Sequence, residues 1–412
     1  MTELGEIPSE WEVKKLKELL DVLKDGTHNP PKRTEEGIPL LSAENIFNGK
    51  INYGINEKCI SEEDYELMHK NYNIEKDDIL MTIVGTIGRV AVVKDNKKFT
   101  VQRSVAILRS NKKVNNLFLT QFLSSTICKK ELDRKSNSTA QAGLYLGELG
   151  KINIIVPSIN EQEKIASILL TVDEQIDNVD ALIEKNKELK KGLMQTLLTK
   201  GIGHTKFKKT EIGEIPEEWE IEYLDNMAKR YSGHTPNKQK EEYWNGNIPW
   251  ISLKDTKKLD KLYINETEDY TTELGIQNSS TVKLPKGTVV ISRDATVGKV
   301  GITKSKDMAT SQHFINYVCS NSINNVFLYY YLFNKKPLFE RIGVGSTIKT
   351  IGLSFFKELK ITVPSIEEQE KIASILFKID EKIEEYQNKK QKLEEIKKGL
   401  MQQLLTGKIR VL

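Results

Sequence analysis

The chain has 412 residues, and 38% of them are hydrophobic, which is enough apolar material for more than one buried core. Its 62 Lys and Arg nearly balance its 58 Asp and Glu, so the formal net charge of +4 excludes a strongly basic protein. Any nucleic-acid binding must therefore depend on local patches. Three widely spaced cysteines and five scattered histidines argue against a disulfide framework and against a zinc site.

The N-terminal residues MTELGEIPSEWE are acidic and lack the apolar core of a signal peptide. No run along the chain approaches the roughly 18 apolar residues that a membrane span needs. We therefore expect a soluble, cytoplasmic protein that does not associate with a membrane.

A nearly identical string occurs twice in the chain. VPSINEQEKIASIL (156–169) and VPSIEEQEKIASIL (363–376) share 13 of 14 residues. Two further pairs of strings recur at almost the same offset, namely LGEIPSEWE (4–12) with IGEIPEEWE (212–220) and KKGLMQTLLT (190–199) with KKGLMQQLLT (397–406). These repeats indicate a tandem duplication, and two copies are too few for a solenoid.

The segments between the repeated strings correspond more loosely. Residues 78–93 alternate apolar and polar around a turn from Gly85 to Gly88, which predicts a β-hairpin. Residues 117–132 have helical spacing, and KINIIVP (151–157) predicts a closing strand that ends at proline. The second half repeats these three patterns at 289–302, 327–339 and 359–364. Each half is therefore predicted to be a mixed α/β globule of roughly 150 residues.

Each globule is followed by a long helix with heptad-like spacing. The apolar positions are Ile165, Leu169, Val172, Ile176, Val179 and Ile183 in the first helix, and Ile372, Leu376, Ile379 and Ile383 in the second. Neither apolar seam can remain in water, so we predict that the two helices pair with each other. An antiparallel pair would carry a pseudo-two-fold axis, and residues 161–199 would span about 58 Å. The intervening residues 200–211 are rich in Gly and Lys, which predicts a surface linker.

Candidate catalytic motifs are incomplete. Asn29-Pro30-Pro31 resembles part of the motif with which adenine methyltransferases hold the target amino group, but the next residue is Lys32, which cannot stack on a flipped base. A plain turn explains the prolines. No compact Asp…Glu-x-Lys nuclease cluster recurs in either globule, and we attribute Glu161, Glu163, Glu368 and Glu370 to favourable interaction with helix dipoles and Lys389, Lys390 and Lys392 to a solvated face.

Two glycine turns could contact phosphates. Gly85 to Gly88 and Thr296 to Gly298 lack the Lys and Ser or Thr that complete a P-loop. A tight hairpin turn is the favoured interpretation. The alternative is a turn that also presents Arg89 or Lys299 to DNA phosphates.

Polar side chains at matching positions could read bases. Gln102 and Arg103 in the first half correspond to Gln312 and His313 in the second, and such side chains can bond to base edges, although exposed polar residues on a strand are common. Polar loops at 136–141 and 345–350 could also read or clamp DNA. The full set of candidate DNA-contacting residues is Lys32, Arg33, Thr86, Arg89, Gln102, Arg103, Ser138, Gln141, Arg293, Thr296, Lys299, Gln312, His313, Ser346 and Lys349.

The repeated GEIP-x-EW, PSI-x-EQ-x-KIA and K-x-GLMQ-x-LL strings resemble those of the specificity subunit of type I restriction-modification systems, over essentially the whole chain. The resemblance implies an α+β fold with two target recognition domains separated by two long antiparallel coiled-coil helices. The implied divisions are a first recognition domain (1–158), a first helix (159–200), a linker (201–211), a second recognition domain (212–365) and a second helix (366–412).

The same resemblance implies a non-catalytic subunit that binds double-stranded DNA at an asymmetric, two-part site. It implies two adenine-N6 methyltransferase subunits and restriction subunits as partners, which use S-adenosylmethionine, ATP and Mg, and no cofactor or metal on this chain. The family transfers no catalytic residue. Two recognition domains on one side of B-DNA need centres roughly 34 Å apart. We therefore expect the helices to set the length of the unrecognised DNA between the two half-sites. One added heptad in each helix should lengthen that gap by about 3 base pairs.

Two alternative functions make different predictions. A self-contained restriction enzyme or methyltransferase would carry catalytic motifs, which this sequence lacks. A coiled-coil adaptor that binds protein and no DNA would show no salt-dependent DNA binding, whereas a DNA reader loses affinity steeply as salt rises.

Overall fold

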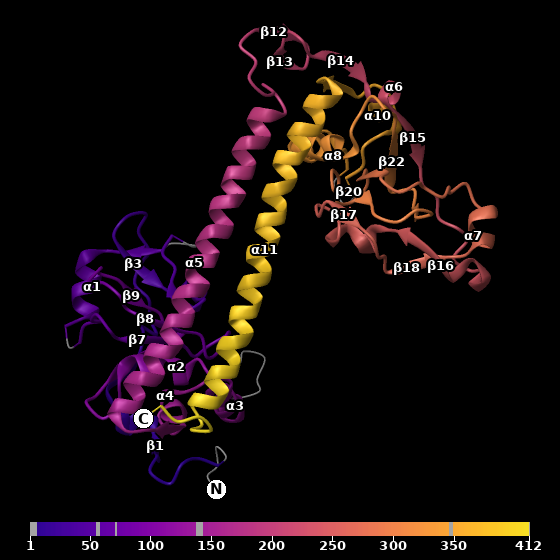
Figure 1. Cartoon of the computed structure of the whole chain (residues 1–412). Coiled ribbons are helices and arrows are strands. Elements are labelled where there is room, and N and C mark those ends of the chain that lie inside the picture. The colour runs from indigo at the N-terminus through magenta and orange to yellow at the C-terminus, as the bar shows by residue number, and fades with distance from the viewer. Residues whose placement is uncertain (1–5, 55–57, 71, 137–142, 346–348, 412) are drawn as a thin grey trace. The chain divides into compact units, whose positions relative to one another are not determined.

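The computed structural model describes residues 6–54, 58–70, 72–136, 143–345 and 349–411. The chain forms two compact units. The first unit comprises Met1–Asp180 and Asn388–Leu412, and the second unit comprises Ala181–Gln387. Each unit contains one globular domain together with parts of both long helices (Figure 1).

The elements of the first half are, in chain order, β1 (Glu12–Lys15), β2 (Leu20–Asp25), β3 (Ile38–Leu41), β4 (Ile46–Phe47), β5 (Lys50–Ile51), β6 (Cys59–Ile60), α1 (Glu62–Met68), β7 (Ile79–Thr82), β8 (Val90–Val92), β9 (Thr100–Val101), β10 (Val105–Ser110), α2 (Asn116–Leu123), α3 (Thr126–Lys135), α4 (Leu146–Leu149), β11 (Asn153–Val156) and α5 (Ile159–Leu197). Short 3-10 turns occupy Leu16–Leu19 and Ala43–Asn45.

Those of the second half are β12 (Phe207–Thr210), β13 (Gly213–Pro216), β14 (Glu220–Tyr223), α6 (Leu224–Met227), β15 (Ala228–Ser232), β16 (Trp244–Ile251), β17 (Tyr263–Ile264), β18 (Asp269–Thr271), α7 (Glu273–Gln277), β19 (Val289–Ser292), β20 (Val300–Thr303), β21 (Ala309–Thr310), β22 (Phe314–Cys319), α8 (Asn325–Asn334), α9 (Lys336–Ile342), α10 (Leu353–Lys357), β23 (Lys360–Val363) and α11 (Ile366–Leu404). Further 3-10 turns occupy Glu241–Tyr243 and Leu253–Lys257.

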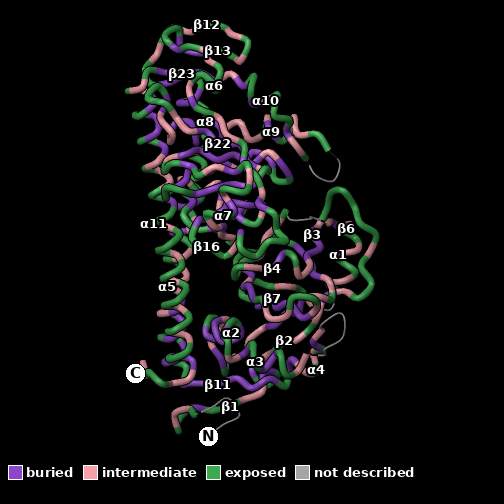
Figure 2. Tube along the Cα trace, turned by 90° about the vertical axis from the view of Figure 1, so that its right-hand side faces the viewer, coloured by how far each residue is buried: buried purple, intermediate pink, exposed green. Residues whose placement is uncertain are grey.

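The core of the first unit is a four-stranded antiparallel sheet in the order β2-β10-β7-β8. Every residue of β7 is buried, because both faces of this central strand are covered (Figure 2). Ile79 and Met81 pack with Phe118 of α2 and Leu169 of α5. Leu80, which points to the opposite face as strand geometry requires, packs with residues of β3 and β9. One face of the sheet therefore attaches to the long helices, and the other supports a small outer sheet.

The second unit repeats this plan. Its sheet has the order β15-β22-β19-β20-β17, so β17 is an added edge strand. Val289 and Ile291 pack on the helical side with Ile372 and Leu376 of α11, whereas Val290 joins the core of the outer side. The predicted hairpins are confirmed, since β7 pairs with β8 and β19 with β20 in antiparallel register.

The closing strands are also confirmed, while the predicted helical segments are each divided. β11 pairs with β1, and β23 pairs with β14. The segment predicted at 117–132 forms α2 and α3, which separate where the Ser125 hydroxyl accepts a hydrogen bond from the backbone N–H of Cys128. The segment at 327–339 likewise forms α8 and α9, with Pro337 in the first turn of α9.

The start of each long helix is held by a tryptophan. The Trp11 indole donates to Glu161 at 3.0 Å in the first unit, and the Trp219 indole donates to Glu368 at 3.0 Å in the second. Our attribution of these two carboxylates to the helix dipole was therefore incomplete, because both accept hydrogen bonds from distant side chains. This contact also gives the repeated GEIP-x-EW string a structural role.

A basic side chain completes each helix start. The Arg410 guanidinium donates to Glu161 at 2.7 and 3.1 Å, and it holds the pKa of that carboxyl below its ordinary value, with help from the Trp11 indole. His204 takes the corresponding place 3.0 Å from Glu368, which also accepts from the backbone N–H of Ile202 at 2.8 Å. Part of the predicted linker thus packs on the start of α11, and residues 207–210 form the β12 strand.

A fully buried glutamine fixes each globular domain to its helix. Gln162 accepts from the backbone N–H of Asn115 at 2.7 Å and donates to the Pro157 carbonyl at 2.9 Å. Gln369 accepts from Asn324 at 2.9 Å and donates to the Pro364 carbonyl at 3.0 Å, and Asn115 and Asn324 in turn cap α2 and α8. The near-identity of the PSI-x-EQ strings therefore reflects one attachment that is built twice.

The two long helices pair antiparallel within each unit (Figure 1). In the first unit Lys397 lies 2.6 Å from Asp173, and Lys390 lies 2.7 Å from Asp180, so ascending positions on α5 meet descending positions on α11. Lys390 is thus ion-paired, and its assignment to a solvated face was wrong. In the second unit Lys190 lies 2.7 Å from Asp380.

The predicted seam positions of the helices are buried or half-buried, namely Ile165, Leu169, Val172, Ile176, Val179 and Ile183 on α5 and Ile372, Leu376, Ile379 and Ile383 on α11. A helix that is both long and apolar enough to cross a lipid bilayer is not found among the described residues.

Candidate nucleic-acid interface

Loops from distant parts of the sequence meet at the end of each central sheet. In the first unit Thr27 forms a parallel bridge with Gln102, its N–H donates to the Val101 carbonyl at 3.0 Å, and the Arg103 N–H donates to the Thr27 carbonyl at 3.0 Å. Residues Val84 and Gly143 form a second bridge beside them. We call residues 26–27, 84–88, 102–104 and 143 the first loop cluster.

The second unit builds the same arrangement. The His234 N–H donates to the Thr310 carbonyl at 3.0 Å, the Arg293 N–H donates to the His313 carbonyl at 2.8 Å, and the Ile351 N–H donates to the Arg293 carbonyl at 2.9 Å. Residues 233–235, 293–298, 311–313 and 349–351 are the second loop cluster. The predicted residues Gln102, Arg103, Gln312 and His313 all lie in these clusters, but the predicted match between the halves is wrong by one residue. The Ile83 N–H donates to the Ser104 carbonyl as the Arg293 N–H donates to the His313 carbonyl, so Ser104 corresponds to His313 and Arg103 to Gln312.

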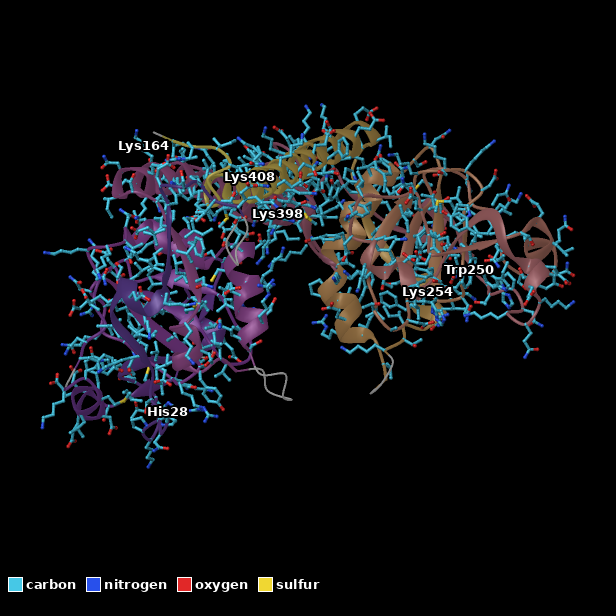
Figure 3. All side chains as sticks on the ribbon, turned by 90° about the horizontal axis from the view of Figure 1, so that it is seen from below. His28, Lys164, Trp250, Lys254, Lys398 and Lys408 are labelled. Atoms are coloured by element: carbon cyan, nitrogen blue, oxygen red, sulfur yellow. The ribbon has the colours of Figure 1, made fainter. Side chains whose placement is uncertain are left out.

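A glycine permits the close approach in each cluster. A Cβ on Gly26 would lie 2.0 Å from the Val101 carbonyl oxygen, and a Cβ on Gly233 would lie 2.2 Å from the Ser311 carbonyl oxygen. No side chain fits so near a backbone oxygen. Neighbouring His28 lies at the outer edge of its domain, where its ring is 2.8 Å from Asp25 (Figure 3).

The turns after β7 and β19 are internally bonded. The backbone N–H of Arg89 donates to the Thr82 hydroxyl at 2.9 Å, and the N–H of Lys299 donates to the Ser292 hydroxyl at 2.9 Å. Both turns therefore have the tight hairpin geometry that we favoured from the sequence. The alternative role of Arg89 and Lys299 toward phosphates stays a prediction.

The candidate cations differ in their environment. Arg89 is exposed and has no ion-pair partner within the described part of the chain. Lys299 is ion-paired with Asp260, and Arg293 donates to the Ile351 carbonyl at 3.0 Å, so both have structural partners. Lys349 donates to the Glu340 carbonyl at 3.1 Å.

The remaining predicted residues differ in their exposure to solvent. Lys32, Arg33, Thr86, Arg103, Thr296 and Gln312 are exposed, and Gln102 and His313 are half-buried. Ser138, Gln141 and Ser346 lie outside the described residues.

The second unit has an aromatic hollow that was not predicted from the sequence. A cavity of about 500 Å³ is lined by residues that include Trp244, Lys254 and Tyr270. Trp244 packs edge-on against Trp250 with ring centroids 4.8 Å apart, and Figure 3 labels Trp250 and Lys254 in this unit. The aromatic residues in YWNGNIPW (243–250) were the available signal, because Trp and Tyr combine apolar area with a polar edge.

Comparison with known proteins agrees with the repeated architecture. The family model described as the type I restriction modification DNA specificity domain matches residues 8–190 and again 216–395. A putative type I restriction enzyme MjaX specificity subunit from Methanocaldococcus jannaschii is 33% identical across 100% of this chain and 96% of its own length. The MjaVIII specificity subunit of the same organism is 28% identical across 98% and 94% of the two chains.

A solved structure has the same fold. The type I restriction-modification S subunit from M. genitalium superposes with a TM-score of 0.59 at 19% identity, covering 98% of this chain and 99% of that one. The α+β fold with two repeated domains and two long helices is therefore shared with S subunits. Because the family model matches both halves in turn, this chain belongs to the type I restriction-modification DNA specificity family.

Proposed function

We propose that this chain is the DNA-recognition subunit of a type I restriction-modification enzyme, and that it reads an asymmetric site in two parts. The observation that carries the proposal is the loop cluster, which is built twice on the same backbone contacts but with different side chains at its surface. Arg103 and Ser104 in one unit stand where Gln312 and His313 stand in the other. Two readers with different side chains recognise different half-sites.

Affinity in this proposal comes from cations around the clusters. Lys32, Arg33, Arg89 and Arg103 of the first unit are exposed. Lysine and arginine contacts to phosphates release counterions, so binding weakens steeply as salt increases. We expect these residues to set affinity and register on double-stranded DNA, while few base-edge contacts set the choice of sequence.

The subunit also has protein partners in this proposal. The relatives are named as specificity subunits of type I restriction enzymes. We infer that this chain joins two adenine-N6 methyltransferase subunits and restriction subunits, and that S-adenosylmethionine, ATP and Mg are used by those partners. The chain itself contributes recognition and positioning, and the chemistry belongs to the partners.

Domain exchange tests the proposal. Residues 1–158 are replaced by the recognition domain of another specificity subunit, the hybrid is co-expressed with its methyltransferase, and methylated sites are mapped by single-molecule sequencing. We expect one half of the methylated site to change and the other half to remain. A hybrid that changes both halves, or neither, would contradict a modular reader.

A binding measurement separates this function from a protein adaptor. The complex with the methyltransferase is titrated with duplex DNA at about 50 and about 200 mM salt. A DNA reader loses orders of magnitude in affinity over that range when it makes several phosphate contacts. An adaptor shows no binding at either concentration.

A further inference from the structure

Four polar side chains form a hydrogen-bonded chain across the second loop cluster. The Asp294 carboxylate lies 2.8 Å from His313 Nδ1, and His313 Nε2 lies 3.4 Å from the amide nitrogen of Gln312. The carbonyl oxygen of Gln312 accepts a hydrogen bond from the hydroxyl of Thr235. These residues come from three loops, so the chain depends on the folded cluster.

The buried Asp294 carboxylate determines which atoms in this series of hydrogen bonds donate and which accept. Asp294 is 9% exposed, and its second carboxyl oxygen has no hydrogen-bond partner, with Arg293 Nε 3.8 Å away. An ionised carboxylate only accepts hydrogen bonds, so His313 Nδ1 must carry the proton and donate it. When the ring is neutral, its Nε2 atom accepts a hydrogen bond from the Gln312 amide.

Gln312 is held from both ends in one orientation. Its amide nitrogen points to His313, and its carbonyl oxygen receives the Thr235 hydroxyl, so a rotation of the amide by half a turn would break both contacts. The exposed side chain keeps one free N–H and one free lone pair, side by side. This pairing of a donor with an acceptor matches the N7 and N6 atoms of adenine in the major groove, whereas guanine offers two acceptors there.

The first loop cluster lacks this device. Val84 stands at the position of Asp294, Arg103 at that of Gln312 and Ser104 at that of His313. The Ser104 hydroxyl accepts a hydrogen bond from the backbone N–H of Ala43 at 3.1 Å instead. The orienting chain is therefore a property of the second unit alone.

We propose that Gln312 reads an adenine in the half-site recognised by the second unit, and that His313 and Asp294 are positioning residues that orient its amide. This inference rests on the proposed function, because it names the base that one reader selects. It assigns a specificity role to three residues whose side chains touch one another.

The first test maps methylation by the holoenzyme with single substitutions. Gln312→Ala is expected to relax a single adenine position in the half-site of the second unit, by roughly tenfold to a hundredfold in preference, because one bidentate contact is lost. Asp294→Asn is expected to relax the same position less. Gln102→Ala, in the first unit, is the control and leaves that position unchanged.

The second test keeps the wild-type protein and alters the DNA. Duplexes carry 7-deazaadenine, which lacks the N7 acceptor, at each adenine of that half-site in turn. One replacement is expected to weaken binding roughly tenfold for the wild type and to have no added effect on Gln312→Ala. Because only the DNA changes, a poorly folding variant does not obscure the wild-type result.

Each outcome has a distinct meaning. If the wild type methylates a two-part site and neither Gln312→Ala nor 7-deazaadenine changes recognition, the assignment of Gln312 is wrong while the proposed function stands. A half-site without any such sensitive adenine has the same meaning. If the wild type recognises no two-part site at all, the proposed function itself is wrong.

Discussion

The two units agree closely where a globular domain meets a long helix and differ where the loops reach the surface. At the helix starts, Glu161 and Glu368 each accept an indole N–H, and Gln162 and Gln369 each bind a backbone N–H of the globular domain. These buried contacts have no tolerance for change, because each loss leaves a polar group without a partner. The attachment is therefore preserved whatever sequence the domain recognises.

At the loop clusters only the backbone contacts are shared. The glycines recur, and so does the bridge that joins Val84 to Gly143 in one unit and Asp294 to Thr350 in the other, but a serine lies in the first unit where a carboxylate-bound histidine lies in the second. Exposed side chains at these positions carry little of the folding energy, so they can diverge without loss of the fold. The two copies have therefore kept the same structural support, while the side chains on their DNA-reading surfaces have diverged.

The substitution with the largest expected effect disrupts the close backbone approach that the two loop clusters share. Gly26→Ala places a Cβ 2.0 Å from the Val101 carbonyl oxygen, so the loops must separate, and we expect binding to the first half-site to weaken roughly tenfold or more. Gly233→Ala should do the same to the other half-site. Binding to duplexes with one altered half-site measures each effect.

Gly192→Ala is the control for both variants. It lies in α5 with no atom within 4 Å of the added Cβ, so it should leave DNA binding unchanged. Equal binding of the Gly26→Ala variant and the control would show that the close approach is not needed.

A smaller effect tests whether the two attachments are equivalent. Gln162→Ala leaves the Asn115 N–H and the Pro157 carbonyl without their partner, and each unsatisfied buried group costs about 1–3 kcal/mol. Gln369→Ala should lower the free energy of unfolding by a similar amount. Urea unfolding followed by circular dichroism, with hydrogen exchange of the two helix starts, compares them. A large effect in one unit and none in the other would refute the equivalence.

The smallest expected effect concerns the arginine at the start of the first long helix. Arg410 lowers the pKa of Glu161 in the folded state, so the stability that this carboxylate contributes is present above its ordinary value of 4.5 and is lost as the pH falls through the lowered value. Below about pH 4.5 we expect hydrogen exchange at residues 159–170 in the wild type to accelerate relative to the intrinsic rate of an unprotected amide at the same pH. Glu161→Gln should reduce this acceleration. Parallel pH profiles for the two proteins would contradict the prediction.

The duplication, the hairpins and the two long helices could be predicted from the sequence, because they follow from repeated strings and from the local spacing of apolar residues. Strand order did not follow, since β10 pairs with β2 and β7 across long separations that no local pattern encodes. The break at Ser125 needed a capping hydroxyl to be recognised within an apolar run. The placement of Gln102 and Gln312 in equivalent loops could be predicted from the repeat, although their residue-by-residue match was one position out. The link from Asp294 to His313 could not be predicted, because it joins two loops.

The roles of Trp11 and Glu161 were also missed, although both lie in repeated strings. Their contact spans 150 positions, and an acidic residue in a first helical turn already has a sufficient local explanation. The recurrence of tryptophan and glutamate together in both halves was the available signal.

The buried indole of Trp11 also provides an optical reporter. It is the one tryptophan of the sequence within the first unit, whereas Trp219, Trp244 and Trp250 belong to the second. Replacing those three by phenylalanine would leave a single emitter that donates to the Glu161 carboxylate. The emission of that protein would then follow the opening of one helix start alone, and a matched protein that retains Trp219 would follow the other.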